Sequence, residues 1–219
     1  RRQRQMCIRD RPLPRREDAL PIYARLVPPS LFFTFTPKIP YAMRIITGKY
    51  KGRHFEVPRS FKARPTTDFA KENIFNVLRA YLDFDETRAL DLFGGTGSIS
   101  LELVSRGCPQ VTTVEKDRQH FSFISQCQRT LGDEAWNPIC ADALRFISRC
   151  AQPYDLVFAD PPYALPELAE LPERVMNSGL VKEGTLFVLE HGKTHDFSDR
   201  PDFLEHRAYG SVNFSLFRK

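Results

Sequence analysis

The sequence lacks the features that mark several specialised classes of protein. No apolar run approaches the ~18 residues that a membrane-spanning helix needs. The five cysteines form no C-x-x-C pair, which argues against a zinc site or a disulfide framework and favours reduced thiols. The five histidines show no metal spacing, and we expect the nearest pair, His191 and His195, to be solvated. A length of 219 residues therefore suits one cytoplasmic domain with room for a small appendage, and we expect no membrane segment and no metal.

Positive charge is concentrated at the front of the chain, although the formal net charge is only +5. Residues 1–42 carry nine Lys/Arg against three Asp/Glu, and residues 43–79 again carry nine against three. Residues 80–219 carry 14 against 21. This asymmetry predicts a basic surface for a polyanion beside a neutral-to-acidic body.

Residues 1–42 are predicted to lie outside the folded protein. They hold seven of the 17 prolines and show no helix or strand period, which is typical of unstructured chain. Met43 opens a well-patterned sequence, so we interpret it as the native start and the preceding residues as upstream or adapter-derived sequence. The alternative is a genuine basic arm that adds affinity for RNA.

A small basic β-hairpin is expected over residues 43–62. A strand that begins at Met43 is followed by Gly48 and Gly52, and an alternating strand then ends before Pro58. Its basic side chains are Arg44, Lys49, Lys51, Arg53 and Arg59. Such one-sided basicity favours nucleic-acid binding, although a solvated charged hairpin would give the same pattern.

From residue 63 onward, predicted strands and helices alternate. We expect strands over 89–93, 111–114, 136–140, 154–159, 185–190, 204–209 and 212–217. Helices are expected over 69–82, 99–105, 118–131, 143–150 and 166–177, and Thr66, Thr67 or Asp68 can cap the first of them. This order predicts an α/β domain over 63–219 with a mostly parallel, doubly wound, Rossmann-like sheet of seven strands, closed by an antiparallel C-terminal pair.

A glycine loop follows the first strand of this sheet. Asp91 through Gly97 occupy a strand–turn–helix corner, where glycines let the backbone approach a ligand. Glu115 lies about 20 residues further on, at the end of the next strand, where an acidic residue takes ribose hydroxyls. A dinucleotide fingerprint would need a third glycine, which is missing after Gly97. A carboxylate at Asp91 instead suits the cationic sulfonium and amino groups of S-adenosylmethionine.

Two further acidic residues lie at or just beyond the ends of strands. Asp142 comes just beyond the third strand and could accept from an adenine amino group, cap the next helix, or do both. Glu190 ends the fifth strand, where it could point into a substrate cleft or merely finish the strand. We leave both alternatives open.

The apolar run before Asp160 ends in the stiff turn Asp160-Pro161-Pro162-Tyr163. A proline cannot donate to a β-ladder, and each proline pushes the preceding residue toward extended geometry. The turn therefore presents a carboxylate, outward carbonyl groups and an aromatic ring at the carboxyl edge of the sheet, where α/β proteins bind ligands. A plain strand end with a proline stop is the alternative.

Together these motifs resemble the RsmD family of bacterial 16S ribosomal RNA (guanine-N2)-methyltransferases. The resemblance covers Met43 to about Lys219 and is carried by the segment from Arg64 to Asp68, the glycine loop and the Asp160 turn. It implies the class I S-adenosylmethionine-dependent methyltransferase fold. It also implies a monomer that acts on 16S rRNA, within a small-subunit ribosomal particle, with no metal.

The resemblance also implies roles for particular residues. It assigns catalysis to Asp160, Pro161, Pro162 and Tyr163. It assigns S-adenosylmethionine binding to Asp91, Phe93, Gly95, Gly97, Glu115, Asp142, Ala143, Thr66 and Thr67, and sets Arg64 between the cofactor and the RNA. The basic charge of the hairpin adds Arg44, Lys49, Lys51 and Arg53 as RNA-binding candidates. The alternatives are an amino-methyltransferase acting on adenine or on a protein glutamine, and a non-catalytic RNA-binding protein with the same fold.

Overall fold

The computed structural model describes residues 42–61 and 67–219. The expectations for residues 1–41, and the predicted ligand contacts of Arg64 and Thr66, lie outside these described residues. The described chain begins with the two short strands β1 (Ala42–Arg44) and β2 (His54–Glu56), which pair antiparallel as the predicted hairpin. Met43 and Val57 of this hairpin segment are buried in the same apolar cluster as the helices beside it.

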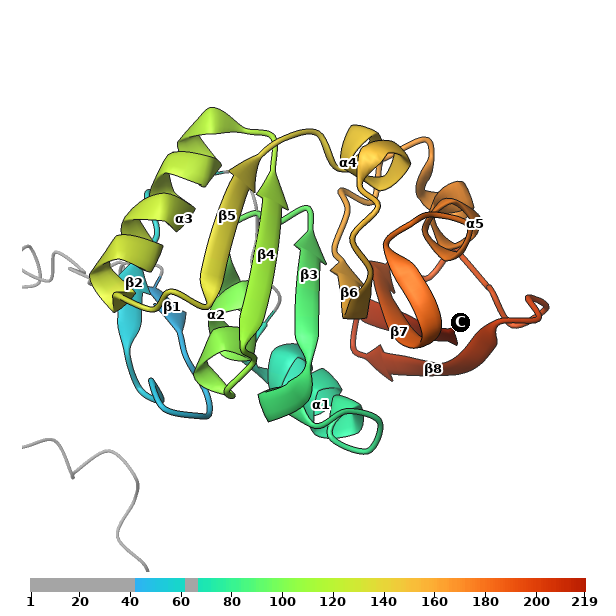
Figure 1. Ribbon diagram of the computed structural model, residues 1–219, viewed down its shortest axis with the longest axis horizontal. Coiled ribbons are helices and arrows are strands. Elements are labelled where there is room, and N and C mark those ends of the chain that lie inside the picture. The colour runs from blue at the N-terminus through green and yellow to red at the C-terminus, as the bar shows by residue number, and fades with distance from the viewer. Residues whose placement is uncertain (1–41, 62–66) are drawn as a thin grey trace, which may run out of the picture. The chain divides into compact units, whose positions relative to one another are not determined.

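The remaining elements alternate as predicted (Figure 1). The helices are α1 (Asp68–Leu78), α2 (Ser98–Ser105), α3 (Arg118–Leu131), α4 (Ala143–Arg149) and α5 (Leu171–Met176), with short 3-10 turns η3 (Phe84–Glu86) and η4 (Leu168–Glu170). The strands are β3 (Arg88–Leu92), β4 (Gln110–Glu115), β5 (Trp136–Cys140), β6 (Tyr154–Ala159), β7 (Val181–His191), β8 (Phe203–Tyr209) and β9 (Val212–Arg218).

The seven strands form one sheet in the order β5-β4-β3-β6-β7-β9-β8. The five strands β3 to β7 pair parallel with one another, whereas β9 pairs antiparallel with both β7 and β8. The order reverses between β3 and β6, where the chain crosses from one half of the sheet to the other, and ligands bind at such a point in α/β proteins. The predicted fold class is confirmed.

Two apolar layers cover the sheet. Side chains of α1, α2 and α3 pack with one set of strand residues, whereas those of α4 and α5 pack with the alternate set. The period of two shows along β3, where Ala89 joins the first cluster and Leu90 and Leu92 join the second. The sheet is thus buried on both faces, so its carboxyl edge is the part of it that opens to a ligand.

The predicted bounds agree best where the apolar pattern is strong and fail where proline intervenes. The bounds of β5, β6 and α3 are as predicted. The helix expected over 166–177 was wrong in its first half, which forms a turn and η4 before the six-residue α5 with Pro172 in its first turn. The first helix ends at Leu78 rather than at residue 82, and β7 begins four residues earlier than predicted.

Candidate active site

Strand register brings four predicted acidic or turn positions to one edge of the sheet. Leu92 pairs with Val114 on one side and with Ala159 on the other, so Phe93 follows beside Glu115 and Asp160. Ala159 also pairs with Leu189, which puts Glu190 next to Asp160. These strand ends open into a cleft of about 660 Å³. Its lining includes Thr67, Asp91, Phe93, Gly95, Glu115, Ala143, Asp160, Pro161, Pro162, Tyr163 and Glu190.

The loop after β3 turns sharply to reach α2. Phe93 has a φ of 64°, a left-handed backbone that costs about 1–3 kcal/mol for a residue with a side chain and is typical of functional sites. Gly94 lies so close to β4 that an added Cβ would be 2.3 Å from Cγ2 of Thr113. Gly97, with a φ of 78°, is the N-cap of α2 and packs near Trp136. The glycines therefore allow both the close approach and the turn.

Asp91 lies beneath this loop and is almost fully buried. Its Oδ2 accepts hydrogen bonds from the backbone N–H of Ser100 at 3.2 Å and from the Ser100 hydroxyl at 2.5 Å. Burial raises the pKa of Asp91 to about 7, against the opposing effect of the Ser100 hydrogen bonds, and the charge of Glu115 adds to the rise. A cationic ligand in the cleft would favour the ionised form of this carboxylate.

The carboxylate of Glu115 is fixed by the backbone on both of its oxygens. Oε2 accepts from the N–H of Gly95 at 2.7 Å, and Oε1 accepts from the N–H of Asp117 at 2.7 Å. Because each carboxylate oxygen can accept more than one hydrogen bond, Glu115 remains able to take the hydroxyl groups of a ligand. The glycine loop and the end of β4 are thereby held in a fixed relation across the cleft.

The Asp160 turn leaves β6 directly into the cleft. Asp160 is half-buried and Pro161 is buried, whereas the residue Tyr163 is 47% exposed. The Tyr163 hydroxyl donates to Oε1 of Glu190 at 3.0 Å. Burial, and then the negative charges of Glu190 and Asp160, raise the pKa of Tyr163 well above its usual range. Tyr163 is therefore a neutral, partly exposed hydrogen-bond donor in the lining of the cleft.

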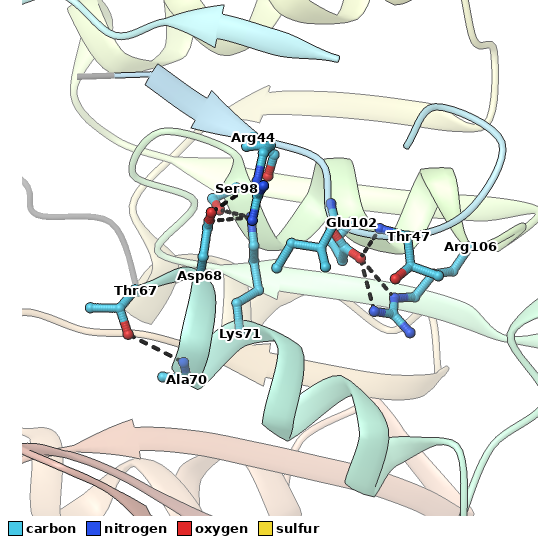
Figure 2. Close-up of polar contacts among 10 residues, drawn as sticks. Arg44, Thr47, Thr67, Asp68, Ala70, Lys71, Ser98, Glu102 and Arg106 are labelled. Carbon is cyan, nitrogen blue, oxygen red and sulfur yellow. Dashed lines mark hydrogen bonds and ion pairs between the residues drawn. The ribbon is translucent and has the colours of Figure 1, made fainter. Parts of the chain in front are cut away.

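Two residues predicted to bind the cofactor have other observed contacts. Gly97 and Asp142 do not belong to the lining of the cleft within the described residues. Gly97 makes the turn into α2, and Asp142 caps α4 by accepting from the N–H of Arg145 at 3.1 Å. Thr67 lines the cleft and also caps α1, since its hydroxyl accepts from the N–H of Ala70 at 3.2 Å (Figure 2). Capping and a ligand contact are compatible at such positions.

The four described basic residues predicted for RNA binding are all exposed. Nε of Arg44 donates to Oδ2 of Asp68 at 3.1 Å, and Nζ of Lys49 lies 2.8 Å from Asp133. The guanidinium of Arg53 lies over the ring of Tyr50, and Lys51 extends from the hairpin turn. The side chains of Arg44 and Asp68 are 49% and 47% exposed, and exposed ion pairs contribute little to stability, so Arg44 could exchange its carboxylate for a phosphate at small cost.

Sequence analysis missed the buried Lys71, which links the hairpin to the cleft. Its Nζ donates to the carbonyl oxygen of Arg44 at 2.8 Å and to the hydroxyl of Ser98 at 3.0 Å, and lies 3.9 Å from Oδ1 of Asp68 (Figure 2). Ser98 lines the cleft. Burial lowers the pKa of Lys71. Its position three residues before the buried Ile74 of α1, on the apolar face of the helix, could have identified it.

Some sequence expectations about side chains need correction. His191 is not solvated but 1% exposed, since it lies in β7 and its ring nitrogens face the carbonyl oxygen of Gly192 and the hydroxyl of Ser215.

The structure also bears on the alternatives left open for two acidic residues. Helix capping by Asp142 is observed. Glu190 does more than finish its strand, because it lines the cleft. Sequence analysis gave no indication of Ser211 and Val212, which reach the cleft because β9 inserts beside β7.

Two general features of the described residues bear on the class of protein. Among residues 42–61 and 67–219, no cluster of His, Cys, Asp or Glu could hold a metal ion. In that same part of the chain, no helix has the length and apolarity to cross a membrane.

The sheet order, the glycine turn after β3 and the acidic strand ends around one cleft define a class I, Rossmann-like methyltransferase fold. The Escherichia coli protein yhhF shares it with a TM-score of 0.72 at 26% identity, over 82% of this chain and 98% of that one. A hypothetical protein of Thermus thermophilus shares it with a TM-score of 0.71 at 31% identity, over 80% and 99%.

The chain belongs to the family described as conserved hypothetical protein 95, whose model matches residues 43–218. It is similar to ribosomal RNA small subunit methyltransferase D of Escherichia coli, with 31% identity over 180 residues, which are 81% of this chain and 90% of that protein. The protein of the same name from Haemophilus influenzae is 29% identical over 189 residues, 84% and 97% of the two chains. The resemblance to the RsmD family is thereby confirmed.

Proposed function

We propose that this chain is an S-adenosylmethionine-dependent RNA methyltransferase that modifies the exocyclic N2 amine of a guanine in 16S ribosomal RNA. The observation that carries the proposal is the meeting of the Asp160-Pro161-Pro162-Tyr163 turn and the glycine loop in one cleft. The names of the relatives support the substrate class. The N2 position follows from the family resemblance.

The lining of the cleft suits S-adenosylmethionine, a cation that carries ribose hydroxyls and a flat adenine. The buried carboxylate of Glu115 would accept from the hydroxyls, and Asp91 would supply negative charge for the cationic end; both line the cleft. Val114 and Ala143 offer apolar surface for the ring. When bound, S-adenosylmethionine would supply an electrophilic methyl group and would leave as S-adenosylhomocysteine, and the proton lost by the methylated amine would pass to Asp160 or to water.

The exocyclic amine of guanine is a poor nucleophile because its lone pair is delocalised into the ring. The Asp160 carboxylate would accept one of its hydrogens, and the carbonyl oxygen of Pro161 would accept the other. Two acceptors favour a pyramidal nitrogen, whose lone pair then points toward the methyl group. Because Pro161 and Pro162 stiffen the turn, these acceptors need little reorganisation, and positioning and electrostatics supply most of the acceleration.

A base inside an RNA helix or loop must unstack to reach this cleft, which costs a few kcal/mol. The exposed ring of Tyr163 could stack on the extruded base. Stacking on an aromatic side chain contributes ~1–3 kcal/mol per base, so it would offset much of that cost.

The basic hairpin would supply RNA affinity through backbone phosphates rather than base choice. Exposed Lys51 and Arg53 are the clearest candidates for such contacts. We propose a small-subunit ribosomal particle as the substrate and a monomeric enzyme, and activity on ribosomal RNA implies the cytoplasm as its location.

The test is the substitution Asp160→Ala, assayed for methyl transfer from labelled S-adenosylmethionine to small-subunit particles from a strain that lacks this enzyme. We expect S-adenosylmethionine binding, measured by calorimetry, to stay close to that of the unmodified protein. Turnover should fall at least about 10²–10³-fold, as when one transition-state contact is removed. Asp199→Ala, at an exposed position, is the control. Near-normal turnover of Asp160→Ala would rule out the proposed role of the turn.

A further inference from the structure

Glu190 is a buried carboxylate that lines the cleft and to which the proposed transfer assigns no task. It lies near the end of β7, with a total exposure of 4%. The register between β6 and β7 sets it beside Asp160, and the register between β7 and β9 pairs it with Phe214. Burying a carboxylate is costly, so acidic side chains are rarely buried without a specific partner.

The Tyr163 hydroxyl is a partner that orients this carboxylate without exhausting it. It donates to Oε1 of Glu190 at 3.0 Å. Each oxygen of a carboxylate can accept more than one hydrogen bond, so the contact with Tyr163 is compatible with a further contact from a ligand. Because Tyr163 is a neutral donor, the pair presents acceptor capacity to the cleft beside the ring on which the base would stack.

The acceptors of Glu190 and Asp160 match the Watson–Crick edge of guanine. That edge has two adjacent donor groups, the N1–H and the N2 amine, whereas the edge of adenine has an acceptor at N1. Enzymes that extrude a base read it by hydrogen bonds to this edge. Because Asp160 and Glu190 are neighbours in strand register and both line the cleft, an acceptor on Glu190 would face the N1–H of a guanine whose N2 amine is held by Asp160.

We propose that Glu190 is a specificity-determining residue that accepts a hydrogen bond from N1–H of the target guanine. This inference rests on the proposed function and assigns the choice of base to a side chain of β7. A base with an unprotonated N1 would set its lone pair against the carboxylate and would be disfavoured by electrostatic repulsion. Adenine is therefore excluded by its N1 as well as by the position of its amine.

The test compares guanine with 2-aminopurine, which keeps the 2-amino group but has an acceptor at N1. Small-subunit particles are assembled from 16S rRNA that carries either base at the nucleotide where methylation has been mapped. We expect the unmodified enzyme to prefer guanine by roughly 10- to 100-fold in kcat/KM, the discrimination of a well-placed base contact. Glu190→Gln should reduce this preference to a few-fold, because an amide can donate to N1 of 2-aminopurine.

Glu183→Gln is the matched control, since Glu183 is an exposed carboxylate at the other end of the same strand. It should keep the full preference for guanine. Equal use of guanine and 2-aminopurine by the unmodified enzyme would overturn the inference even if Glu190→Gln failed to fold. An unchanged preference in a folded Glu190→Gln would overturn the inference alone. No methylation of guanine by the unmodified enzyme would overturn the proposed function and the inference together.

Discussion

Replacing Glu102 by glutamine should strongly destabilise the fold, because Glu102 joins the hairpin to α2 from a fully buried position. Its Oε2 accepts from the N–H of Ile46 at 2.9 Å, and its Oε1 accepts from the N–H of Thr47 at 3.0 Å. Nε and Nη2 of Arg106 also lie 3.0 and 2.9 Å from Oε1 (Figure 2). The side chains of Glu102 and Arg106 are 0% and 4% exposed.

The size of the effect follows from this burial. Glu102→Gln keeps the volume but removes the negative charge, so the guanidinium of Arg106 stays buried without its counter-ion. Breaking a buried ion pair in this way costs about 3–5 kcal/mol. The amide group also faces N–H donors with a donor of its own, which adds to the penalty. Since domains are stable by only ~5–15 kcal/mol, the variant should lose a large share of its stability.

The assay is equilibrium unfolding in urea, with Glu170→Gln as the matched control. Glu170 pairs with Arg174 on the surface, with side-chain exposures of 61% and 42%, and such pairs contribute about 0–1 kcal/mol. We expect a large fall in the unfolding midpoint for Glu102→Gln, with an unchanged slope, and almost none for the control. A loss below about 1 kcal/mol for Glu102→Gln would refute the structural role of this buried carboxylate.

Two further predictions concern the ligands. Because the pKa of Asp91 is about 7 without ligand, a bound cation would have to displace its proton at lower pH. Calorimetry should therefore show that S-adenosylmethionine binds more weakly as the pH falls below 7, by up to tenfold per pH unit, and Asp91→Asn should abolish this dependence. The same pH dependence of the binding constant in the unmodified protein and in Asp91→Asn would contradict this prediction. Neutralising Arg44, Lys51 and Arg53 together should weaken RNA binding. It should also reduce the slope of log K against log salt concentration by up to about 0.7–0.9 per lost phosphate contact. Unchanged RNA binding by the triple variant would show that the RNA-binding surface lies outside the hairpin.

Much of the fold was predictable because the apolar patterns along it are local. Short buried runs such as residues 154–159 and the amphipathic helix Arg118–Leu131 have the same bounds in the sequence and in the structure. Prolines 166 and 172 explain why a helix predicted across them became a turn and a short helix. The hairpin was predictable from its glycines, but its attachment through Glu102 was not. Those hydrogen bonds join Glu102 to Ile46 and Thr47, which lie 56 and 55 positions away in the sequence.

The candidate site was predictable in its parts but not in its assembly. Sequence order placed Asp91 in the first strand of the sheet, just before the glycine loop, and Glu115 and Asp160 at the ends of two other strands, which is enough to put them near one edge of a parallel sheet. It could not place Glu190 beside Asp160, because that depends on which strand pairs with β6. Lys71 was missed because a lysine on a helix is normally read as exposed; its helical spacing from Ile74 indicated the apolar face, but its contact with Ser98 depends on how α1 packs against α2.

The most direct test of the central claim is to map the methyl group that this enzyme adds. Small-subunit particles from a deletion strain would be treated with the purified protein and S-adenosylmethionine, and the 16S rRNA would be digested to nucleosides and analysed by mass spectrometry. We predict a single new N2-methylguanosine, absent when Asp160→Ala replaces the unmodified enzyme. A methyl group on adenine, on a ribosomal protein glutamine, or on neither would contradict the account.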